Sequence, residues 1–222
     1  MTLDAIRDAI TALGLAWRGA FHPGEDSGLP DSELGTVVLL GFVGRVNWAA
    51  FAASPEAGDG RADPLDRWSR RVVDGLARRL AARALFPFDG PPWLPFQRWA
   101  QKAEPLHRSP LGMLIHPDWG LWHSWRGALG FREHVELPEP DRRPSPCDDC
   151  KDKPCLTACP VTAFTRAGYD VAACGAHLAA PAGQSCIEEG CAARLACPIG
   201  EAHRYAPEQS AFHMRAFRKA RF

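Results

Sequence analysis

The stretch from residue 147 to residue 160 reads CDDCKDKPCLTACP, and its four cysteines are separated by spacers of two, four and three residues. A second group of four cysteines occupies residues 174–198, with spacers of eleven, four and five residues, and it also ends in Cys-Pro. All eight cysteines of the chain belong to these two groups, and residues 1–146 contain none. The cysteines therefore divide the chain into a thiol-free part and a part built around thiols.

Eight thiols match the demand of two [4Fe–4S] clusters, because each cluster takes four thiolates. The Cys-Pro endings resemble those of the bacterial ferredoxin run, in which the fourth cysteine ligates the other cluster. One departure is that Lys151–Pro154 place four residues between the second and third cysteines, where the ferredoxin run has two. The resemblance implies two ligand sets, the first made of Cys147, Cys150, Cys155 and Cys197, and the second of Cys159, Cys174, Cys186 and Cys191.

Two other interpretations of clustered cysteines stay open at this point. A disulfide scaffold belongs to small secreted domains. The N-terminal stretch MTLDAIRDAITALG lacks the basic and apolar regions of a secretory signal, and no apolar stretch approaches 18 residues. A cytoplasmic protein with reduced thiols and no membrane segment is therefore expected. Zinc sites usually pair two Cys-x2–4-Cys knuckles across a long spacer, and here Cys155 and Cys159 crowd the knuckle formed by Cys147 and Cys150.

The length of 222 residues suits a medium domain with a smaller one attached. We expect a domain over residues 1–137, a linker over residues 138–146 (PEPDRRPSP, with four prolines) and a cluster-binding domain over residues 147–222. Basic and acidic residues both number 26 in the whole chain, and from residue 147 onward they number 9 and 8. Because a nucleic-acid surface needs clustered positive charge, this balance argues against a nucleic-acid partner.

Hydrophobic periodicity predicts the main elements. An amphipathic helix is expected over residues 2–14 and a buried strand over residues 36–43 (TVVLLGFV). Asp63-Pro64 has the form of a helix start. The helix is expected to reach about residue 85, with an inward face of Leu65, Trp68, Val72, Leu76 and Leu80. A strand pair over residues 112–115 and 121–131, a short helix over 161–164 and a basic helix over 208–221 complete the expectation.

Aromatic residues crowd three thiol-free segments: residues 86–100 (FPFDGPPWLPFQRWA), 114–120 (LIHPDWG) and 121–127 (LWHSWRG). On an extended strand, Trp122, Ser124 and Arg126 would point one way and His123 and Trp125 the other. One interpretation is a tryptophan-rich core in which Arg126 forms a structural ion pair.

A resemblance supplies the other interpretation. The order Gln97-Arg98, Ile115-His116-Pro117, Gly120, Trp122 and Arg126-Gly127 resembles the animal cobalamin-processing family of the cobalamin C type. That family implies an α+β, nitroreductase-like fold with an antiparallel sheet. It also implies cobalamin bound base-off and removal of the upper axial ligand. Gln97 matches a position lining the corrin pocket, and Arg126 matches an arginine that contacts glutathione. The expected cofactor-binding residues are Trp93, Phe96, Gln97, His116, Trp122 and Arg126.

The thiol-rich part resembles the two-cluster, ferredoxin-like portion of epoxyqueuosine reductase, through the first cysteine run, the stretch YDVAAC at residues 169–174 and the last cysteine group. Epoxyqueuosine reductase places two [4Fe–4S] clusters beside cobalamin. Together the two resemblances imply an iron–sulfur corrinoid reductase whose partners are a corrinoid and an upstream electron donor, either a flavoprotein or a ferredoxin reductase. The Asp-x-His-x-x-Gly signature of a protein histidine ligand to cobalt does not occur, so base-off binding without such a ligand is expected.

Three rival functions remain. A ferredoxin-type electron carrier would bind no corrinoid. An epoxyqueuosine-reductase-like enzyme would act on tRNA and would need a basic face. An FMN-dependent reductase would share the nitroreductase-like fold, but no glycine-rich or arginine-rich phosphate cradle is evident, so FMN ranks below cobalamin.

Overall fold

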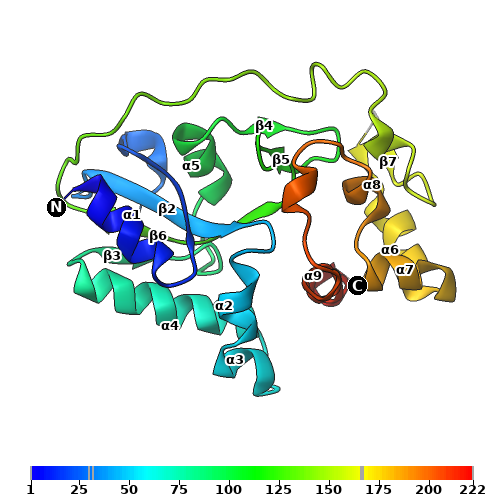
Figure 1. The fold of residues 1–222 in the computed structure, drawn as a ribbon, viewed down its shortest axis with the longest axis horizontal. Helices are drawn as coiled ribbons and strands as arrows, with labels where there is room; N and C mark the ends of the chain where they lie inside the picture. Colours follow the sequence, from blue (N-terminus) through cyan, green and yellow to red (C-terminus); the bar gives the residue numbers. More distant parts are fainter. Residues whose placement is uncertain (1, 30, 32, 166–167, 222) are drawn as a thin grey trace. The chain divides into compact units, whose positions relative to one another are not determined.

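The computed structural model describes residues 2–29, 31, 33–165 and 168–221, shown as a ribbon in Figure 1. The chain forms two compact units. Unit 1 comprises Met1–Pro105 and His123–Arg142, and unit 2 comprises Leu106–Trp122 and Arg143–Phe222. The mixed fold of helices and antiparallel strands is confirmed. The segment Leu106–Trp122, which we expected in the N-terminal domain, groups instead with the cysteines.

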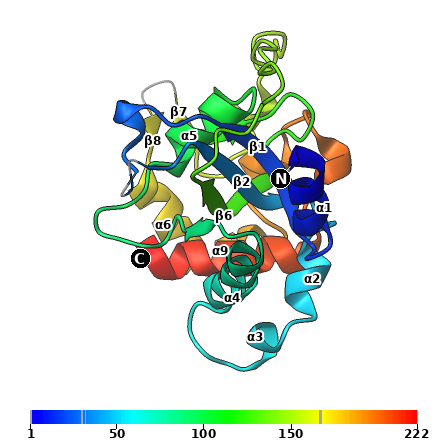
Figure 2. The same ribbon diagram turned by 90° about the vertical axis from the view of Figure 1, so that its left-hand side faces the viewer.

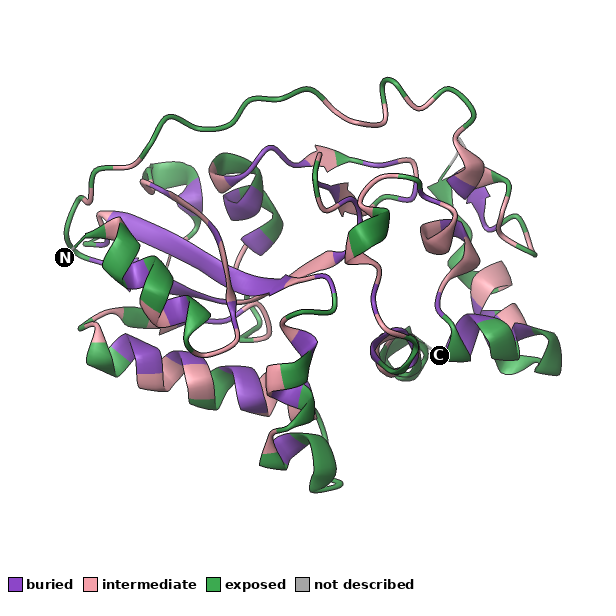
Figure 3. Cartoon of the chain, viewed as in Figure 1, coloured by how far each residue is buried: buried purple, intermediate pink, exposed green. Residues whose placement is uncertain are grey.

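Unit 1 is built on an antiparallel sheet of four strands in the order β1-β2-β6-β3. The strands are β1 (Ala16–Phe21), β2 (Thr36–Val43), β3 (Arg83–Leu85) and β6 (His123–Phe131). The expected buried strand over residues 36–43 is confirmed as β2, which is buried along almost its whole length (Figure 3). β1 was not predicted, since its sequence AWRGAF lacks a β-branched run.

The helices of unit 1 are α1 (Leu3–Thr11), η1 (Glu25–Ser27), α2 (Trp48–Ala52), α3 (Pro55–Gly58), α4 (Pro64–Arg79) and α5 (Phe96–Ala103). α4 packs against β3 and β6, whereas α1 and α5 pack against β1 (Figures 1 and 2). The prediction that α4 reaches residue 85 was wrong, because Ala81 takes φ 52° and the chain then enters β3. Leu65, Trp68 and Leu76 are buried as predicted, with Val73 buried in place of Val72.

Unit 2 consists of short elements. They are β4 (His107–Arg108), β5 (Leu114–Ile115), η2 (Pro154–Leu156), β7 (Phe164–Thr165), β8 (Gly168–Tyr169), α6 (Val171–Ala179), η3 (Pro181–Gly183), α7 (Gln184–Glu188), α8 (Ala192–Leu195), η4 (Glu201–His203) and α9 (Pro207–Arg221). α9, the longest of them, packs against α6 and α7 and confirms the basic helix expected over residues 208–221.

Two predictions about short elements were wrong. The strand over residues 112–115 does not pair with residues 121–131, because β5 pairs with β4 while β6 pairs with β2 and β3. The helix expected over residues 161–164 does not form, since Thr162 takes φ 51° and β7 begins at Phe164. Residues 134–145, which include most of the expected linker, contain no helix or strand, and the boundary between the two units falls between Arg142 and Arg143. None of the helices in the described ranges has both the length and the apolar character of a membrane-spanning segment.

Candidate metal centre and pocket

The eight cysteines of unit 2 are all free thiols, carried on several short elements. η2 holds Cys155, α6 holds Cys174 and α7 holds Cys186. Cys191 is the N-cap of α8, and Cys197 follows the end of that helix. Short helices joined by turns bring thiols from a stretch of 51 residues into one small unit.

Four thiols interact electrostatically with one another, and we call them the first thiol set: Cys147, Cys150, Cys155 and Cys197. Burial raises the pKa of Cys155, and the neighbouring Cys197, Cys147 and Cys150 raise it further. Burial and then Cys197 raise the pKa of Cys147 in the same way. The pKa of Cys197 is likewise raised by burial and by Cys150. Because such interactions weaken with distance, these four thiols lie close together.

The other four thiols, the second thiol set, interact in the same way: Cys159, Cys174, Cys186 and Cys191. The pKa of Cys186 is raised by burial and by Cys159 and Cys174. The pKa of Cys191 is raised by burial and by Cys186 and Cys174. The two sets therefore cross the two groups seen in the sequence, since Cys159 interacts with later cysteines and Cys197 with earlier ones.

The four-residue spacer of the first run has a structural use. Lys153, at φ 40°, directs its ammonium group back onto the chain. Its Nζ donates hydrogen bonds to the carbonyl oxygens of Cys147 at 2.7 Å and Cys150 at 3.1 Å. The longer loop therefore closes on itself and holds the first two thiols beside Cys155.

The surroundings of the thiols fit iron–sulfur clusters. Burial opposes bare thiolates, so a cationic group must compensate them. Backbone N–H groups also point at sulfur: that of Ala163 donates to Sγ of Cys159 at 3.3 Å, and that of Ile199 lowers the pKa of Cys197 against the effect of burial. Hydrogen bonds to sulfur and burial are two of the factors that set a cluster's reduction potential.

Apolar side chains pack against the first thiol set. Leu111, Ile115 and Leu121 form one buried cluster with Cys155 and Cys197. In the part of the chain that the structure describes, no three His, Cys, Asp or Glu side chains lie close enough together to hold a single metal ion. That result concerns a site for one ion, whereas a [4Fe–4S] cluster spreads four thiolates over four irons.

Sequence reasoning missed two side chains beside the second thiol set. Tyr169 stacks on Phe164 with ring centroids 4.6 Å apart, and its pKa is raised by burial and by a hydrogen bond with Cys174. His177 places Nε2 3.8 Å from Sγ of Cys186. The signal for both was available, because α6 begins within YDVAAC and runs on to His177.

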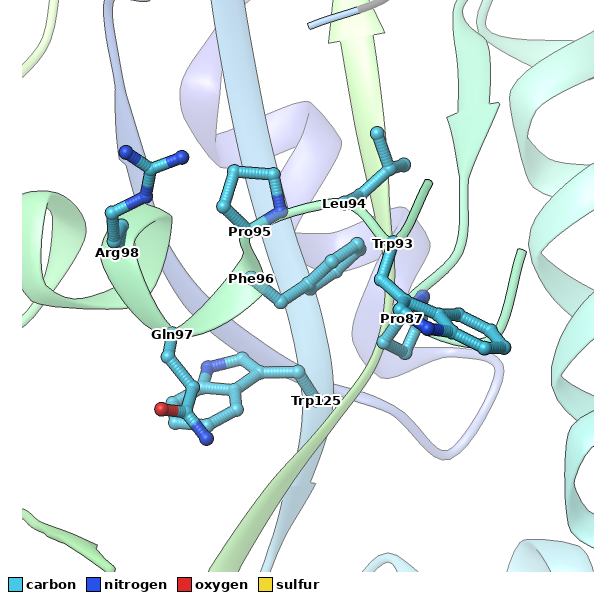
Figure 4. A pocket seen from close by; sticks show the side chains of 8 residues that line it. All are labelled: Pro87, Trp93, Leu94, Pro95, Phe96, Gln97, Arg98 and Trp125. Carbon is cyan, nitrogen blue, oxygen red and sulfur yellow. The ribbon is translucent and has the colours of Figure 1, made fainter. Parts of the chain in front are cut away.

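Unit 1 contains a pocket of about 520 Å³ beside the N-terminus of α5, which Figure 4 shows from close by. Gln97 and Trp125 lie on one side of it, and Trp93 with Pro87 on the other. Its remaining lining residues are Leu94, Pro95, Phe96 and Arg98. Of the residues expected to bind the cofactor, Trp93, Phe96 and Gln97 therefore share one pocket. Trp125, which was not among the expected residues, also lines this pocket.

A buried ion pair supports this pocket from within unit 1. Arg18 on β1 is fully buried and binds both carboxylate oxygens of Glu104 at 2.8 Å. Its guanidinium also donates to the carbonyl oxygens of Phe42 at 3.1 Å and Ser124 at 3.2 Å, and it lies 5.3 Å from the ring centroid of Trp125. Arg18 thus joins three strands beneath the Trp125 wall.

Arg126 has a different neighbourhood from Gln97. The register of β6 shifts between Gly127 and Trp125, so Arg126 is the extra residue of a β-bulge opposite β2. Its guanidinium binds Asp66 and, at 3.0 Å, the hydroxyl of Ser69, both on α4. These contacts agree with the interpretation of Arg126 as a partner in a structural ion pair.

His116 and Trp122, the other two residues expected at the cofactor, belong to unit 2. Both are buried, at 4% and 1% exposure. Arg194 of α8 lies 4.5 Å from the ring centroid of Trp122, and His116 stacks on Trp119. Their surroundings within unit 2 are thus those of the thiol-binding part.

Comparison with known proteins gives a likeness in fold. No protein-family model and no curated protein matches the sequence. The structure resembles epoxyqueuosine reductase from Streptococcus thermophilus with a TM-score of 0.54 and 13% identity, over 95% of this chain and 70% of that one. It also resembles epoxyqueuosine reductase solved with an epoxyqueuosine-modified tRNA-Tyr stem loop, with a TM-score of 0.51 and 16% identity, over 93% of this chain and 68% of that one.

The likeness covers both units, because it extends over more than nine-tenths of the chain. The sequence resemblance to epoxyqueuosine reductase, drawn from the cysteine part alone, is confirmed at the level of fold. The further likeness to the cobalamin C type, the nitroreductase-like description of unit 1 and the ferredoxin-like description of unit 2 stay predictions.

Proposed function

We propose that this protein is an iron–sulfur oxidoreductase whose two [4Fe–4S] clusters are ligated by the first and the second thiol sets. The carrying observation is the division of eight free thiols into two electrostatically linked sets of four. When bound, such clusters supply single electrons at low potential. The fold of epoxyqueuosine reductase supports the same class of activity.

The residues of unit 2 prepare these ligands. Lys153 holds Cys147 and Cys150 in one loop, and apolar side chains exclude water from Cys155 and Cys197. Electrostatic interactions are stronger where water is excluded. The reduction potential of a cluster bound here would therefore depend strongly on the N–H groups that donate to its sulfur ligands.

Metal analysis tests this proposal. Anaerobically purified protein should contain about eight irons and as many sulfides per chain. Zinc in place of iron and sulfide would refute it. In protein treated with a thiol-alkylating reagent after mild oxidation, Cys197 should become reactive together with Cys147, Cys150 and Cys155, and not with Cys191.

We further propose that the group reduced is a corrinoid bound base-off at the pocket of unit 1. Its support is the sequence resemblance together with the aromatic walls of Trp93, Phe96 and Trp125 around Gln97. Titration with hydroxocobalamin should shift the corrin absorbance to shorter wavelength, and Trp125→Ala should weaken binding. Ligand at about 100 times its dissociation constant should stabilise the protein by about 2.7 kcal/mol. An unchanged spectrum and an unchanged melting temperature would favour a ferredoxin-type carrier.

A second candidate is an enzyme of the epoxyqueuosine-reductase type that acts on tRNA. Two observations favour it over the corrinoid-processing role: the likeness in fold, and the tRNA stem loop bound in one of the similar structures. The sequence argument against nucleic acid is weakened accordingly. The final turns of α9 also expose Arg215, Arg218, Lys219 and Arg221. A modified stem loop should bind with an affinity that falls steeply with salt, and charge reversal at Arg218 should reduce that slope. No binding at low salt would exclude this candidate.

A further inference from the structure

The segment Leu106–Trp122 contains a rigid turn over residues 116–120, which we call the HPDWG turn. His116 and Gly120 exchange two backbone hydrogen bonds of 2.9 Å. The His116 Nδ1 atom accepts hydrogen bonds from the backbone N–H groups of Asp118 at 3.1 Å and Trp119 at 3.4 Å. The imidazole also stacks on the Trp119 ring, with centroids 3.9 Å apart. The histidine therefore closes the turn from inside.

The HPDWG turn lies in backbone contact with the loop that follows Cys197. A Cβ atom on Gly120 would lie 2.0 Å from the carbonyl oxygen of Ile199, and one on Gly200 would lie 2.4 Å from the carbonyl carbon of Trp119. Both glycines have positive φ, 58° and 72°. Neither position accommodates a side chain, so the turn and the Cys197 loop approach as closely as two backbones can.

The same turn also binds the chain that enters the first cysteine run. Both oxygens of the Asp118 carboxylate accept hydrogen bonds from the Arg143 guanidinium, each at 2.7 Å. The carbonyl oxygen of Arg143 lies 2.9 Å from Nε2 of His107 on β4. Arg143 precedes Cys147 by four residues.

Cys147 and Cys197 are the most widely separated members of the first thiol set, 50 residues apart in the sequence. The HPDWG turn contacts the segment next to each of them. Beyond the turn, Leu121 packs with Cys155 and Cys197, and its carbonyl oxygen accepts a hydrogen bond from Arg194. The thiol-free segment thus borders the first set by contacts of three kinds: backbone packing, an ion pair and apolar packing.

We infer that the HPDWG turn is a positioning element for the first thiol set. Through Asp118 and Gly120 it fixes the segments next to Cys147 and Cys197, which must converge on one cluster. The inference rests on the proposed function. Groups outside the ligands orient the ligands of metal centres, and their loss commonly weakens metal retention by about 10- to 100-fold. The contacts of Gly120 and Asp118 lie beside Cys147 and Cys197, whereas Cys159 and Cys191 of the second set share only the apolar cluster around Leu121. The first set should therefore depend on these two residues more than the second set does.

Matched substitutions separate positioning from general stability. Gly120→Ala inserts a methyl group between the two backbones, whereas its control Gly112→Ala places alanine at a similar φ of 76° with no atom within 4 Å. Asp118→Asn removes the charge from the ion pair with Arg143. Its control is Asp59→Asn, since Asp59 binds Arg67 through two hydrogen bonds of 2.7 Å in unit 1.

The full-length protein, reconstituted with iron and sulfide, is treated with a chelator and an alkylating reagent, and each labelled cysteine is located by mass spectrometry. In Gly120→Ala and Asp118→Asn, the first thiol set should be labelled about tenfold faster than in the controls, with the second set unchanged. The inference would be overturned if both thiol sets of these variants were labelled at the control rates, or if labelling of both sets were accelerated equally. Wild-type protein that takes up no iron would refute the proposed function itself, whereas iron-loaded wild type with unaffected variants would refute only the positioning role.

Discussion

Replacing Glu104 by alanine removes the carboxylate that neutralises the fully buried guanidinium of Arg18. Both side chains are almost inaccessible, at 0% and 5% exposure, and two hydrogen bonds of 2.8 Å join them. Removing one partner of a buried ion pair typically costs about 3–5 kcal/mol, because the remaining charge stays in a medium of low polarity. We therefore expect Glu104→Ala to lower the free energy of unfolding by about 3–5 kcal/mol.

Urea denaturation of the metal-free protein measures this loss, followed by tryptophan fluorescence and by far-ultraviolet circular dichroism. The two probes also test whether the two units unfold together. Glu104→Gln keeps an acceptor for Arg18 and should lose less than alanine does. Asp59→Ala breaks the more exposed pair with Arg67, whose side chains are 29% and 26% exposed, and should cost about 0–1 kcal/mol. If Glu104→Ala costs no more than Asp59→Ala, the reasoning about burial is refuted.

Four other single positions give testable outcomes. Gly41→Ala should prevent the normal pairing of β2 with β6, because its Cβ would lie 1.9 Å from a carbonyl oxygen of β6; Gly75→Ala, with no atom within 4 Å in the middle of α4, should instead stabilise the protein by about 0.5–1 kcal/mol in the same thermal melt. Glu56 has its pKa lowered from 4.5 to about 2, chiefly by its hydrogen bond with Arg71, so its contribution to stability is present above pH 4.5 and lost as the pH falls to about 2. Acid unfolding of Glu56→Gln should lack that part of the pH dependence, and an unaltered profile would contradict the assignment. Gln97→Ala should weaken hydroxocobalamin binding in a spectroscopic titration without changing the iron content, and a loss of iron would show that the two units are not independent.

Local chemistry made parts of the fold predictable. The continuous aliphatic run over residues 36–43 predicted a strand buried on both faces, and these residues form β2. Pro64 marked the start of α4, since proline suits the first turn of a helix. The end of that helix was not predictable in the same way. The chain leaves the helix at Ala81 and enters β3, whose pairing partner β6 lies about 45 residues further along the chain.

The candidate site likewise has features that follow from local sequence and features that depend on tertiary contacts. The count and spacing of the cysteines indicated two sets of four thiols, because ligand number is a property of composition. Lys153 was not identified, since its role depends on how the loop folds back on the thiols. Tyr169 and His177 were missed although they flank Cys174 in the sequence. Trp125 was passed over in favour of Arg126, because a bulge in β6 decides which neighbours each of them meets.

From its sequence alone, this chain could be expected to carry two four-thiol sets, a strand at the centre of a sheet and an aromatic segment that includes Gln97. Each of these depends on residue type and on spacing over a few turns. Only the tertiary structure decided that the HPDWG turn belongs with the cysteines, although 26 residues separate its end from Cys147. The contact between Gly120 and the Cys197 loop joins residues almost 80 positions apart, and close approach of two backbones has no local signal beyond the glycines themselves.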